Sequence, residues 1–415
     1  MRYGLRPSKS DDCLFLLHDK AGQLIGVSGW HVDDGLLCGT QEFYDVMRKV
    51  AKDLEFGKMV EKDFKFCGVK FLQDSDFSVH MDQTHMVDDL EIIPITSGRL
   101  DSDKCSPAEV TQLRGRIGSI LYIVGLTRPF ESYSVSHIAG FVTEGTVEHL
   151  KGINKVIAFM KSTRDCKLTY PGGVATDYLY TFHDSNFRKE RDSGSQLGLL
   201  SYIGGPIDSQ GRVTPAVLLR WTSKRARRVC HSTLASETLA ATAGLDLQSG
   251  LLFRLKELGI HPESVLITDC RSLHDHIYSM TSKSAEILLP DVHELREASM
   301  PWRSWAEDHD QQSVEMWWVP TDRQLADNLT KVVTPSSHQF MESIRVNSFS
   351  LGENYVRPRP SQRSLKSFAT LRVDHFFAWL TAEQHMEAAL TSGDACDLPP
   401  WTPPEWLEAL TGSLT

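Results

Sequence analysis

Hydrophobic and polar positions follow two different periods along this chain, and each period predicts a different kind of element. Near the start, the apolar runs CLFLLH and LIGVSGWHV flank the turn-forming residues DKAGQ, so residues 13–39 are predicted to form a hairpin. The next stretch, QEFYDVMRKVAKDL, has apolar residues at helical spacing. Two strand-like runs follow it, FKFCGVKFLQ and DFSVHM. The N-terminal quarter of the chain therefore predicts strands accompanied by one helix.

Residues 107–161 show a helical period and are rich in apolar side chains. PAEVTQLRGRIGSILYIVGLTRP is predicted to form one helical unit that ends at Pro129, and TVEHLKGINKVIAFMKS to form a second with one apolar face. PGGVATD, residues 171–177, combines proline, glycine and small residues between two periodic regions. We therefore expect a linker there.

Beyond residue 177 the pattern changes to three strands, a long helix, a strand, a helix, a strand and a helix. The strands are predicted at DYLYTFHDSNF, SQLGLLSYIGG, AVLLRWTSK, SVLITDC and VEMWWVP, and the helices at 232–258, RSLHDHIYSM and RQLADNLTKVV. This order is typical of an α/β or α+β domain with a mixed sheet. From residue 335 to 415 the period fades, and we expect a loose tail containing one short amphipathic helix, HFFAWLTAEQHMEAAL.

Composition narrows the class of protein further. The 415 residues are 41% hydrophobic and 24% charged, as in soluble globular proteins of two or three domains. The net charge of −10 argues against a uniformly basic nucleic-acid binder but permits a local basic groove. Eight cysteines stand singly, which favours free thiols in a reducing compartment. The chain contains neither an apolar run of the length that spans a membrane nor a secretory leader at Met1, so we expect a protein that is not secreted.

Four acidic residues in the second half stand where strands end or helices begin. Asp184 closes the run YLYTFHD, Asp269 closes VLITD, Glu237 lies in the first turns of the long helix, and Asp327 follows the last strand. Such positions can converge in a mixed sheet, and four carboxylates repel one another unless a cation neutralises them. Oxygen ligands select Mg²⁺ or Mn²⁺, and two such ions can hydrolyse a phosphodiester. A single Asp at the end of a strand is more often a turn former or a helix N-cap, so the interpretation as a metal site depends on all four acids together.

Two further acids, Asp33 and Asp34, stand side by side in GWHVDDGLLCG between short apolar runs. Taken by themselves, these two residues are best explained as part of a polar Asp-Asp-Gly turn.

Several motifs together indicate a family. YGLRPS, DDCLF, HVDDGLLCG and LRGRIGSILYIVGLTRP resemble YGLKQS, DPCVF, YVDDILLTG and YRSLVGSLLYLTATRPD. HDSNF resembles DADWA, STLASETLA resembles STAEAEYIA, ITDCRS resembles the CDNQSA segment, and VPTDRQLADNLTKVV resembles VPTEDQLADILTKPL. The motifs occur in the order in which they occur in copia-type LTR-retrotransposon Pol polyproteins. The chain is therefore similar, over residues 1–334, to the C-terminal part of such a polyprotein.

The resemblance implies a domain organisation. It implies a truncated reverse-transcriptase palm at 1–105, a helical thumb or connection at 106–170, the linker at 171–177, an RNase H-like domain at 178–334 and the tail at 335–415. It also assigns the candidate site residues: metal ligands of the palm at Asp33 and Asp34, and catalytic metal ligands of the RNase H-like domain at Asp184, Glu237, Asp269 and Asp327.

A local basic strip, SKRARR, is the candidate nucleic-acid contact, because Lys and Arg bind phosphates. Its residues are Lys224, Arg225, Arg227 and Arg228. A solvated strand end is the alternative for this stretch. The RNA–DNA hybrid itself would be recognised by its shape and its 2′-hydroxyl groups.

The function that the resemblance implies is Mg²⁺-dependent (or Mn²⁺-dependent) hydrolysis of the RNA strand of RNA–DNA hybrids. Implied partners are the hybrid and other parts of a Pol polyprotein, with no membrane, in a cytoplasmic virus-like particle or the nucleus. The family's first polymerase aspartate and its fingers lie upstream of the YGLKQS motif, so we expect no DNA polymerisation from this chain alone. Departures such as Ile287, where the KHID motif has histidine, leave an inactive remnant or interaction module as the alternative. The LADNLTK match disfavours an unrelated metal-dependent nuclease.

Overall fold

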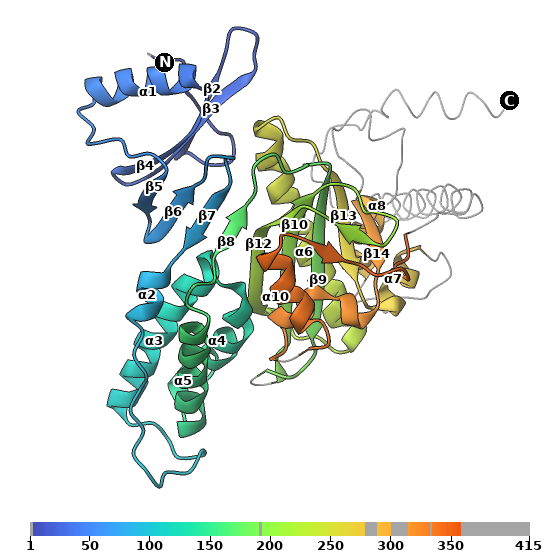
Figure 1. The fold of residues 1–415 in the computed structure, drawn as a ribbon. Coiled ribbons are helices and arrows are strands. Elements are labelled where there is room, and N and C mark those ends of the chain that lie inside the picture. Colours follow the sequence, from blue (N-terminus) through green and yellow to red (C-terminus); the bar gives the residue numbers. More distant parts are fainter. Residues whose placement is uncertain (1–2, 191–192, 279–288, 300–313, 333, 358–415) are drawn as a thin grey trace, which may run out of the picture. The chain divides into compact units, whose positions relative to one another are not determined.

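The computed structural model describes residues 3–190, 193–278, 289–299, 314–332 and 334–357 (Figure 1). All described residues belong to one compact unit, residues 1–358. The expected helix at HFFAWLTAEQHMEAAL and the departure at Ile287 lie outside the described residues.

An antiparallel four-stranded sheet with one helix forms the N-terminal part. Its strands, in spatial order, are β1 (Arg6–Pro7), β2 (Leu14–His18), β3 (Leu24–His31) and β4 (Asp34–Gly39). Helix α1 (Gln41–Asp53) buries Phe43 and Met47 against this sheet. Gly26 allows this packing, because a Cβ atom there would lie 2.0 Å from the Phe43 ring. The predicted hairpin and helix are confirmed, with β4 added to the hairpin.

A second antiparallel sheet joins distant parts of the sequence. It contains β5 (Asp63–Phe66), β6 (Val69–Gln73), β7 (Val79–Asp82) and β8 (Leu168–Tyr170) in that order. FKFCGVKFLQ is thus a hairpin, and the prediction of one strand there is wrong. Cys67 and Gly68 both have positive φ angles, 48° and 68°, as the two central residues of a tight hairpin turn require.

Helices occupy the region between β7 and β8 (Figure 1). They are α2 (Thr84–Asp88), α3 (Pro107–Leu126), α4 (Ser132–Ala139) and α5 (Val147–Ser162), with short 3-10 turns η1 (Pro129–Glu131) and η2 (Val142–Glu144). Helix α3 begins with a capping box of Ser106 and Glu109 around Pro107. Leu113, Ile120 and Ile153 are fully buried in the core that these helices share. The predicted helical region is confirmed.

A five-stranded mixed sheet forms the second half of the unit (Figure 1). Its spatial order is β12 (Ala216–Arg225), β10 (Gln196–Gly204), β9 (Tyr178–Asn186), β13 (Glu263–Thr268) and β14 (Val314–Trp318). β9, β10 and β12 are antiparallel neighbours, whereas β13 runs parallel to both β9 and β14. Five strands that the sequence predicted are therefore present, in one mixed sheet.

Helices cover both faces of this sheet. Helix α6 (Thr233–Glu257), which starts at the N-cap Ser232, covers one face together with α7 (Arg271–Tyr278) and α8 (Leu289–Ser299). Helix α10 (Ser337–Arg345) covers the other face. The side chains of β13 alternate accordingly: Leu266 packs toward α6, whereas Val265 and Ile267 pack in the opposite core. A sheet with both faces covered thus positions the strand ends rigidly.

Two predictions about the C-terminal part are wrong. RQLADNLTKVV is not one helix: its first residue ends the 3-10 turn η5 (Thr321–Arg323), Gln324 has an extended backbone, and a second 3-10 turn, η6 (Leu325–Leu329), follows. The loose tail does not start at residue 335: α10 and β15 (Phe349–Ser350) follow, and β15 pairs with β11 (Arg212–Val213). Apolar residues of α10, of β15 and of the position after β15 complete the core on the α10 face of the sheet; these are Phe340, Ile344, Phe349 and Leu351.

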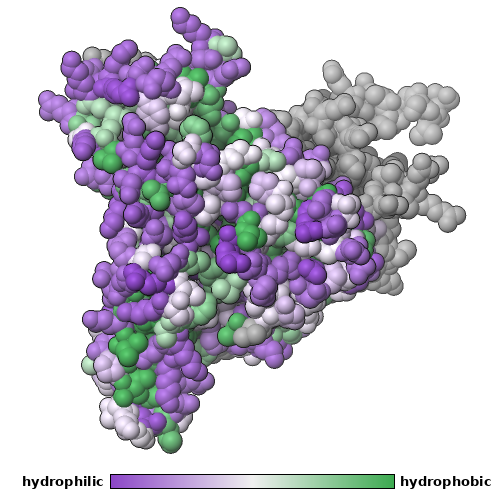
Figure 2. Space-filling view, in the orientation of Figure 1, coloured by the Kyte–Doolittle hydropathy of each residue, from purple (hydrophilic) through white to green (hydrophobic). Residues whose placement is uncertain are grey.

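The surface facing the viewer in Figure 2 is mainly hydrophilic, with hydrophobic groups gathered in its lower part, where Figure 1 shows α3 and α5. Exposed apolar residues in or shortly before α3 in the chain include Ile92, Leu100 and Leu121, with 62%, 68% and 42% exposure. Exposed apolar side chains are normal on protein surfaces. Within the described residues, no helix combines the length and the apolar character needed to cross a membrane.

Candidate active site

The four acids predicted in the second half converge at one end of the mixed sheet. Asp184 lies near the end of β9, Asp269 directly follows β13, Glu237 lies in the second turn of α6, and Asp327 lies in η6. Asp184 is 2% exposed, Glu237 5% and Asp327 1%, and Asp269 is half-buried. Four elements that are far apart in the sequence thus each contribute one carboxylate to a site that is mostly closed to water.

Alternation along β9 sends its residues to both faces of the sheet. Asp184 points to the face on which η6 lies, together with Tyr180 and Phe182 of the core there. Ser185 points to the other face, where its hydroxyl donates a 2.9 Å hydrogen bond to Glu237 Oε1. Two consecutive residues at the end of β9, Asp184 and Ser185, therefore contact the η6 side and the α6 side of the sheet, respectively.

Hydroxyl groups and one ammonium hold the carboxylates in place. The Thr330 hydroxyl donates to Asp184 Oδ2, and the Thr321 hydroxyl bonds to the Asp269 carboxylate. Lys331 Nζ lies 2.7 Å from Asp327 Oδ1 and 3.6 Å from Asp184 Oδ2. One carboxylate oxygen, Glu237 Oε2, is buried without a hydrogen-bond partner.

The electrostatic state of the site follows from burial and mutual repulsion. Burial, followed by the charges of Asp327 and Asp269, raises the pKa of Asp184 to about 8, although Lys331 and Thr330 act in the opposite direction. Burial and the charges of Asp184 and Asp269 raise the pKa of Glu237, and burial raises the pKa of Asp269. Such raised values mark a site that would gain from a cation.

The donor set has the chemistry of a hard divalent cation site. All four side chains offer carboxylate oxygen, which Mg²⁺ and Mn²⁺ prefer, and the unpartnered Glu237 Oε2 is available to accept a cation. As the side chains lie, no group of three or more His, Cys, Asp or Glu residues within the described ranges already has the arrangement of a metal site. Lys331 supplies the positive charge instead.

Three residues that the sequence analysis missed assemble this site: Gly198, Gln324 and Lys331. Gly198 of β10 is the direct neighbour of Asp184, and a Cβ atom there would lie 2.7 Å from the Ala326 carbonyl oxygen. Only glycine therefore lets η6, with Asp327, lie directly on the sheet. Gln324 fixes the same turn, since its amide donates to the His183 carbonyl at 3.0 Å and accepts from Ala326 N at 3.2 Å. A glycine inside a strand was the available signal for a close backbone approach.

His183, next to Asp184, has a structural environment. Its side chain is fully buried, both ring nitrogens lack hydrogen-bond partners, and burial lowers its pKa to about 3. A neutral, desolvated imidazole packed beside α6 is not positioned to transfer protons.

This burial predicts an acid-dependent loss of stability. Because the folded pKa lies below the unfolded value, the unfolded state binds more protons, so stability falls as pH decreases from about 6.5 toward 3, by at most about 1.4 kcal/mol per pH unit. Urea unfolding between pH 4 and 7.5 should show a shallower pH dependence for His183→Leu than for the wild type. The exposed His261 provides the control, because His261→Leu should leave the slope unchanged. Equal slopes for wild type and His183→Leu would contradict a desolvated His183.

The predicted basic strip forms the exposed end of edge strand β12 and the loop after it. Lys224, Arg225, Arg227 and Arg228 are all exposed. Arg228 is held by both carboxylate oxygens of Asp291 in α8, at 2.8 and 2.9 Å. The strip therefore offers positive charge to solvent, and its role as a phosphate contact stays a prediction.

Asp33 and Asp34 lie apart from the four-acid cluster in the chain, at the tip of the β3–β4 hairpin. Both are exposed, and His31 pairs with Asp34 across a turn in which Val32 has a positive φ of 56°. The turn that was the alternative interpretation is thus present, and metal binding by the two acids stays a prediction.

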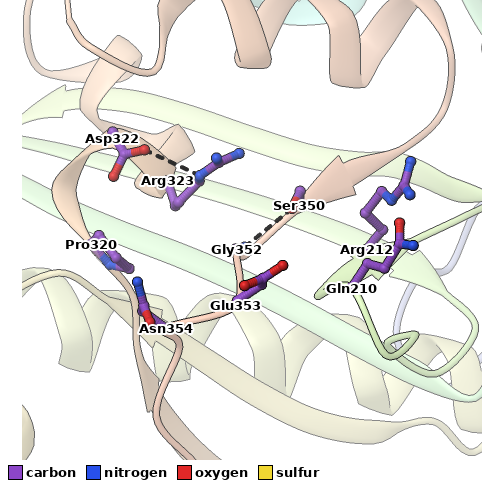
Figure 3. Close-up of a pocket in the computed structure, with 9 residues that line it drawn as sticks. All are labelled: Gln210, Arg212, Pro320, Asp322, Arg323, Ser350, Gly352, Glu353 and Asn354. Atoms are coloured by element: carbon purple, nitrogen blue, oxygen red, sulfur yellow. Dashed lines mark hydrogen bonds and ion pairs between the residues drawn. The ribbon is translucent and has the colours of Figure 1, made fainter.

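A polar pocket of about 470 Å³ lies near the cluster but contains none of the four acids (Figure 3). Asp322 and Arg323 of η5 line it and form an ion pair of 3.2 Å. Arg212 and Gln210 lie on the opposite side of the close-up, and Glu353 lies between the two sides (Figure 3). Because two arginines and two acids line it, the pocket has no net charge that selects an anion or a cation.

Three antiparallel strands followed by two parallel ones, with acids at the ends of β9 and β13, make this the mixed-sheet α/β domain that the sequence predicted. Comparisons with known proteins find relatives of this chain among the retrovirus-related Pol polyproteins of transposons. The polyprotein from transposon TNT 1-94 of Nicotiana tabacum is 24% identical over 55% of this chain. That from transposon RE1 of Arabidopsis thaliana is 23% identical over 81%. A transposon Ty5-1 protein of Saccharomyces cerevisiae is 23% identical over 48%. The resemblance to copia-type Pol polyproteins is thereby confirmed.

These matches cover different shares of the relatives. The chain spans 16% of the tobacco polyprotein, 22% of the Arabidopsis one and 66% of the yeast protein. No family model matches the chain. Among solved structures, a foamy viral protease-reverse transcriptase in complex with an RNA/DNA hybrid matches 70% of this chain and 35% of its own. Its TM-score is 0.36 at 12% identity, so the fold assignment rests on the strand order.

Proposed function

We propose that this chain hydrolyses the RNA strand of RNA–DNA hybrids with the help of Mg²⁺, as the RNase H-like part of a longer transposon Pol polyprotein. The observation that supports this proposal best is the cluster of Asp184, Glu237, Asp269 and Asp327. Burial, followed by the charges of the neighbouring acids, raises the pKa of Asp184, Glu237 and Asp269, in a site that is mostly closed to water. A cluster that is costly without a cation is well explained by a function that uses one.

Asp184, Glu237, Asp269 and Asp327 would hold Mg²⁺, or Mn²⁺ in its place. When bound, such ions lower the pKa of a water molecule and stabilise negative charge on the leaving oxygen. The protein's own contribution is orientation: Ser185, Thr330 and Thr321 each donate a hydroxyl hydrogen bond to one of the carboxylates. These bonds restrict the carboxylate rotamers before substrate arrives, which reduces the reorganisation that catalysis requires.

The hybrid would bind along the edge of the sheet that β12 forms. An RNA–DNA hybrid is recognised through its shape, its 2′-hydroxyls and its phosphates, and exposed Lys224 and Arg227 offer phosphate contacts there. Binding should therefore weaken as salt increases.

Polymerase activity is not part of the proposal for this chain alone. Asp33 and Asp34 share an exposed hairpin, and within the described ranges no third acid joins them in a metal-binding group. Two carboxylates bind Mg²⁺ weakly, so we expect no DNA synthesis from the purified chain.

The test uses a labelled RNA–DNA hybrid and Mg²⁺, with single-stranded RNA as the substrate control. We expect hybrid cleavage by the wild type and at least about a hundredfold slower cleavage by Asp269→Asn, a barrier increase of about 2.7 kcal/mol. Asp322→Asn is the matched control, because Asp322 is exposed on η5 and pairs with Arg323 outside the cluster. No cleavage by a folded wild type that also shows no Mg²⁺-dependent rise in melting temperature would instead identify an inactive remnant.

A further inference from the structure

Lys331 is placed among the carboxylates by the same turn that carries Asp327. It follows η6 by two residues, and its backbone nitrogen donates to the Asp327 carbonyl at 2.9 Å. Its ammonium lies 2.7 Å from Asp327 Oδ1 and 3.6 Å from Asp184 Oδ2. The two aspartate side chains are 1% and 3% exposed, whereas that of Lys331 is 38% exposed. The lysine thus reaches into the cluster from its solvent side.

The charge of Lys331 acts on the whole cluster and not on one partner. It counteracts the rise in the pKa of Asp184, of Glu237 and of Asp269. In return, although burial alone would lower it, the pKa of Lys331 is raised by the charges of Asp184 and Asp327. Attraction to the acids therefore outweighs the desolvation of the ammonium.

One ammonium does not satisfy four carboxylates. Glu237 Oε2 remains buried and unpartnered, and the pKa of Asp184 stays raised despite Lys331. A lysine on a flexible four-carbon stem with a solvent-facing side can leave the cluster without crossing the core. A divalent cation would bring twice the charge to the same oxygen atoms.

We propose that Lys331 is a resident counter-ion that stabilises the carboxylate cluster and that a divalent cation must displace to bind. This inference rests on the proposed function, because it assigns the cation site to the same four acids. The lysine then sets the metal affinity: it keeps the cation-free protein folded and weakens cation binding by competition.

The experiment compares the wild type with Lys331→Met by isothermal titration calorimetry with Mn²⁺ and with Mg²⁺. Methionine keeps an unbranched stem but removes the charge. We expect the variant to bind Mn²⁺ at least tenfold more tightly, to melt at a lower temperature in EDTA, and to gain more in melting temperature when Mn²⁺ is added. Lys331→Arg retains the charge and should keep the weaker, wild-type affinity, which separates charge from side-chain shape.

Lys151→Met is the matched control, because Lys151 also pairs with one aspartate, at 2.6 Å from Asp101, but on the exposed surface of α5. It should change neither the affinity nor the response to Mn²⁺. Equal Mn²⁺ affinity of the wild type and Lys331→Met would overturn the inference and leave the proposed function intact. Absence of Mn²⁺ binding by wild type, Lys331→Met and Lys331→Arg, all folded by circular dichroism, would overturn the proposed function as well.

Discussion

Replacing Asp184 by asparagine should abolish hybrid cleavage and at the same time make the cation-free protein more stable. Asp184 is the most central of the four acids, since the charges of Asp327 and Asp269 both act on it and it also acts on Glu237. Asparagine can still accept the Thr330 hydrogen bond, but it offers no negative charge. We expect cleavage to fall at least about a thousandfold, an increase of about 4 kcal/mol in the barrier.

The stability gain should depend on pH in a defined direction. Burial and neighbouring charges raise the folded pKa of Asp184 to about 8, above its unfolded value of 3.8, so the folded wild type holds a proton that the unfolded chain has released. Wild-type stability therefore decreases as pH rises through this interval. In EDTA, Asp184→Asn should match the wild type near pH 4 and exceed it by on the order of 2 kcal/mol near pH 8.

Urea unfolding in EDTA across this interval measures the gain, and the hybrid assay measures the loss. Asp33→Asn is the control: Asp33 is exposed on the β3–β4 hairpin, so the change should affect neither quantity. A variant that loses cleavage but is less stable than the wild type at pH 8 would show that the cluster is not repulsive. A stable variant that still cleaves would exclude Asp184 from the reaction.

Local patterning predicted most of the mixed-sheet domain. Successive side chains of a strand point to opposite faces of the sheet, one toward α6 and the other toward α10. Val265, Leu266 and Ile267 of β13 alternate in this way. The four acids could be found because each stands where an element ends or begins, and such ends meet when strands share a sheet. The five strands and the long helix α6, which each depend on the pattern of one element, were therefore predicted correctly.

Predictions failed where a contact between distant residues decides the local structure. RQLADNLTKVV has a helical pattern, but the Gln324 side chain bonds to the His183 carbonyl and holds its own backbone extended. Phe340 and Ile344 have helical spacing, yet a short segment among polar residues gave no reason to expect α10 in the core. Lys331 is an ordinary lysine in the sequence, and only the folded chain shows which carboxylates it meets.

Gly198→Ala should destabilise the protein by about 3 kcal/mol, the upper end of the usual range for overpacking, although it adds only one methyl group. The added Cβ would lie 2.7 Å from the Ala326 carbonyl oxygen and 2.9 Å from Leu329 Cβ. A backbone atom cannot rotate away as a flexible side chain can, so η6 must move off the sheet. Because η6 carries Asp327 and precedes Lys331, hybrid cleavage should fall further than the loss of folded protein explains.

Gly29→Ala tests the same change where space exists. Gly29 also lies in a strand, β3, but a Cβ atom there would meet only Leu14 Cδ1 at 3.8 Å, so stability should stay within about 0.5 kcal/mol of the wild type. Urea unfolding of both variants measures the loss of stability. Cleavage rates at saturating hybrid then show whether the displacement of η6 lowers activity beyond that loss. If Gly198→Ala were as stable and as active as Gly29→Ala, η6 would not rest on β10. The close approach of η6 at Gly198 would then not be what places the Asp327 carboxylate beside Asp184.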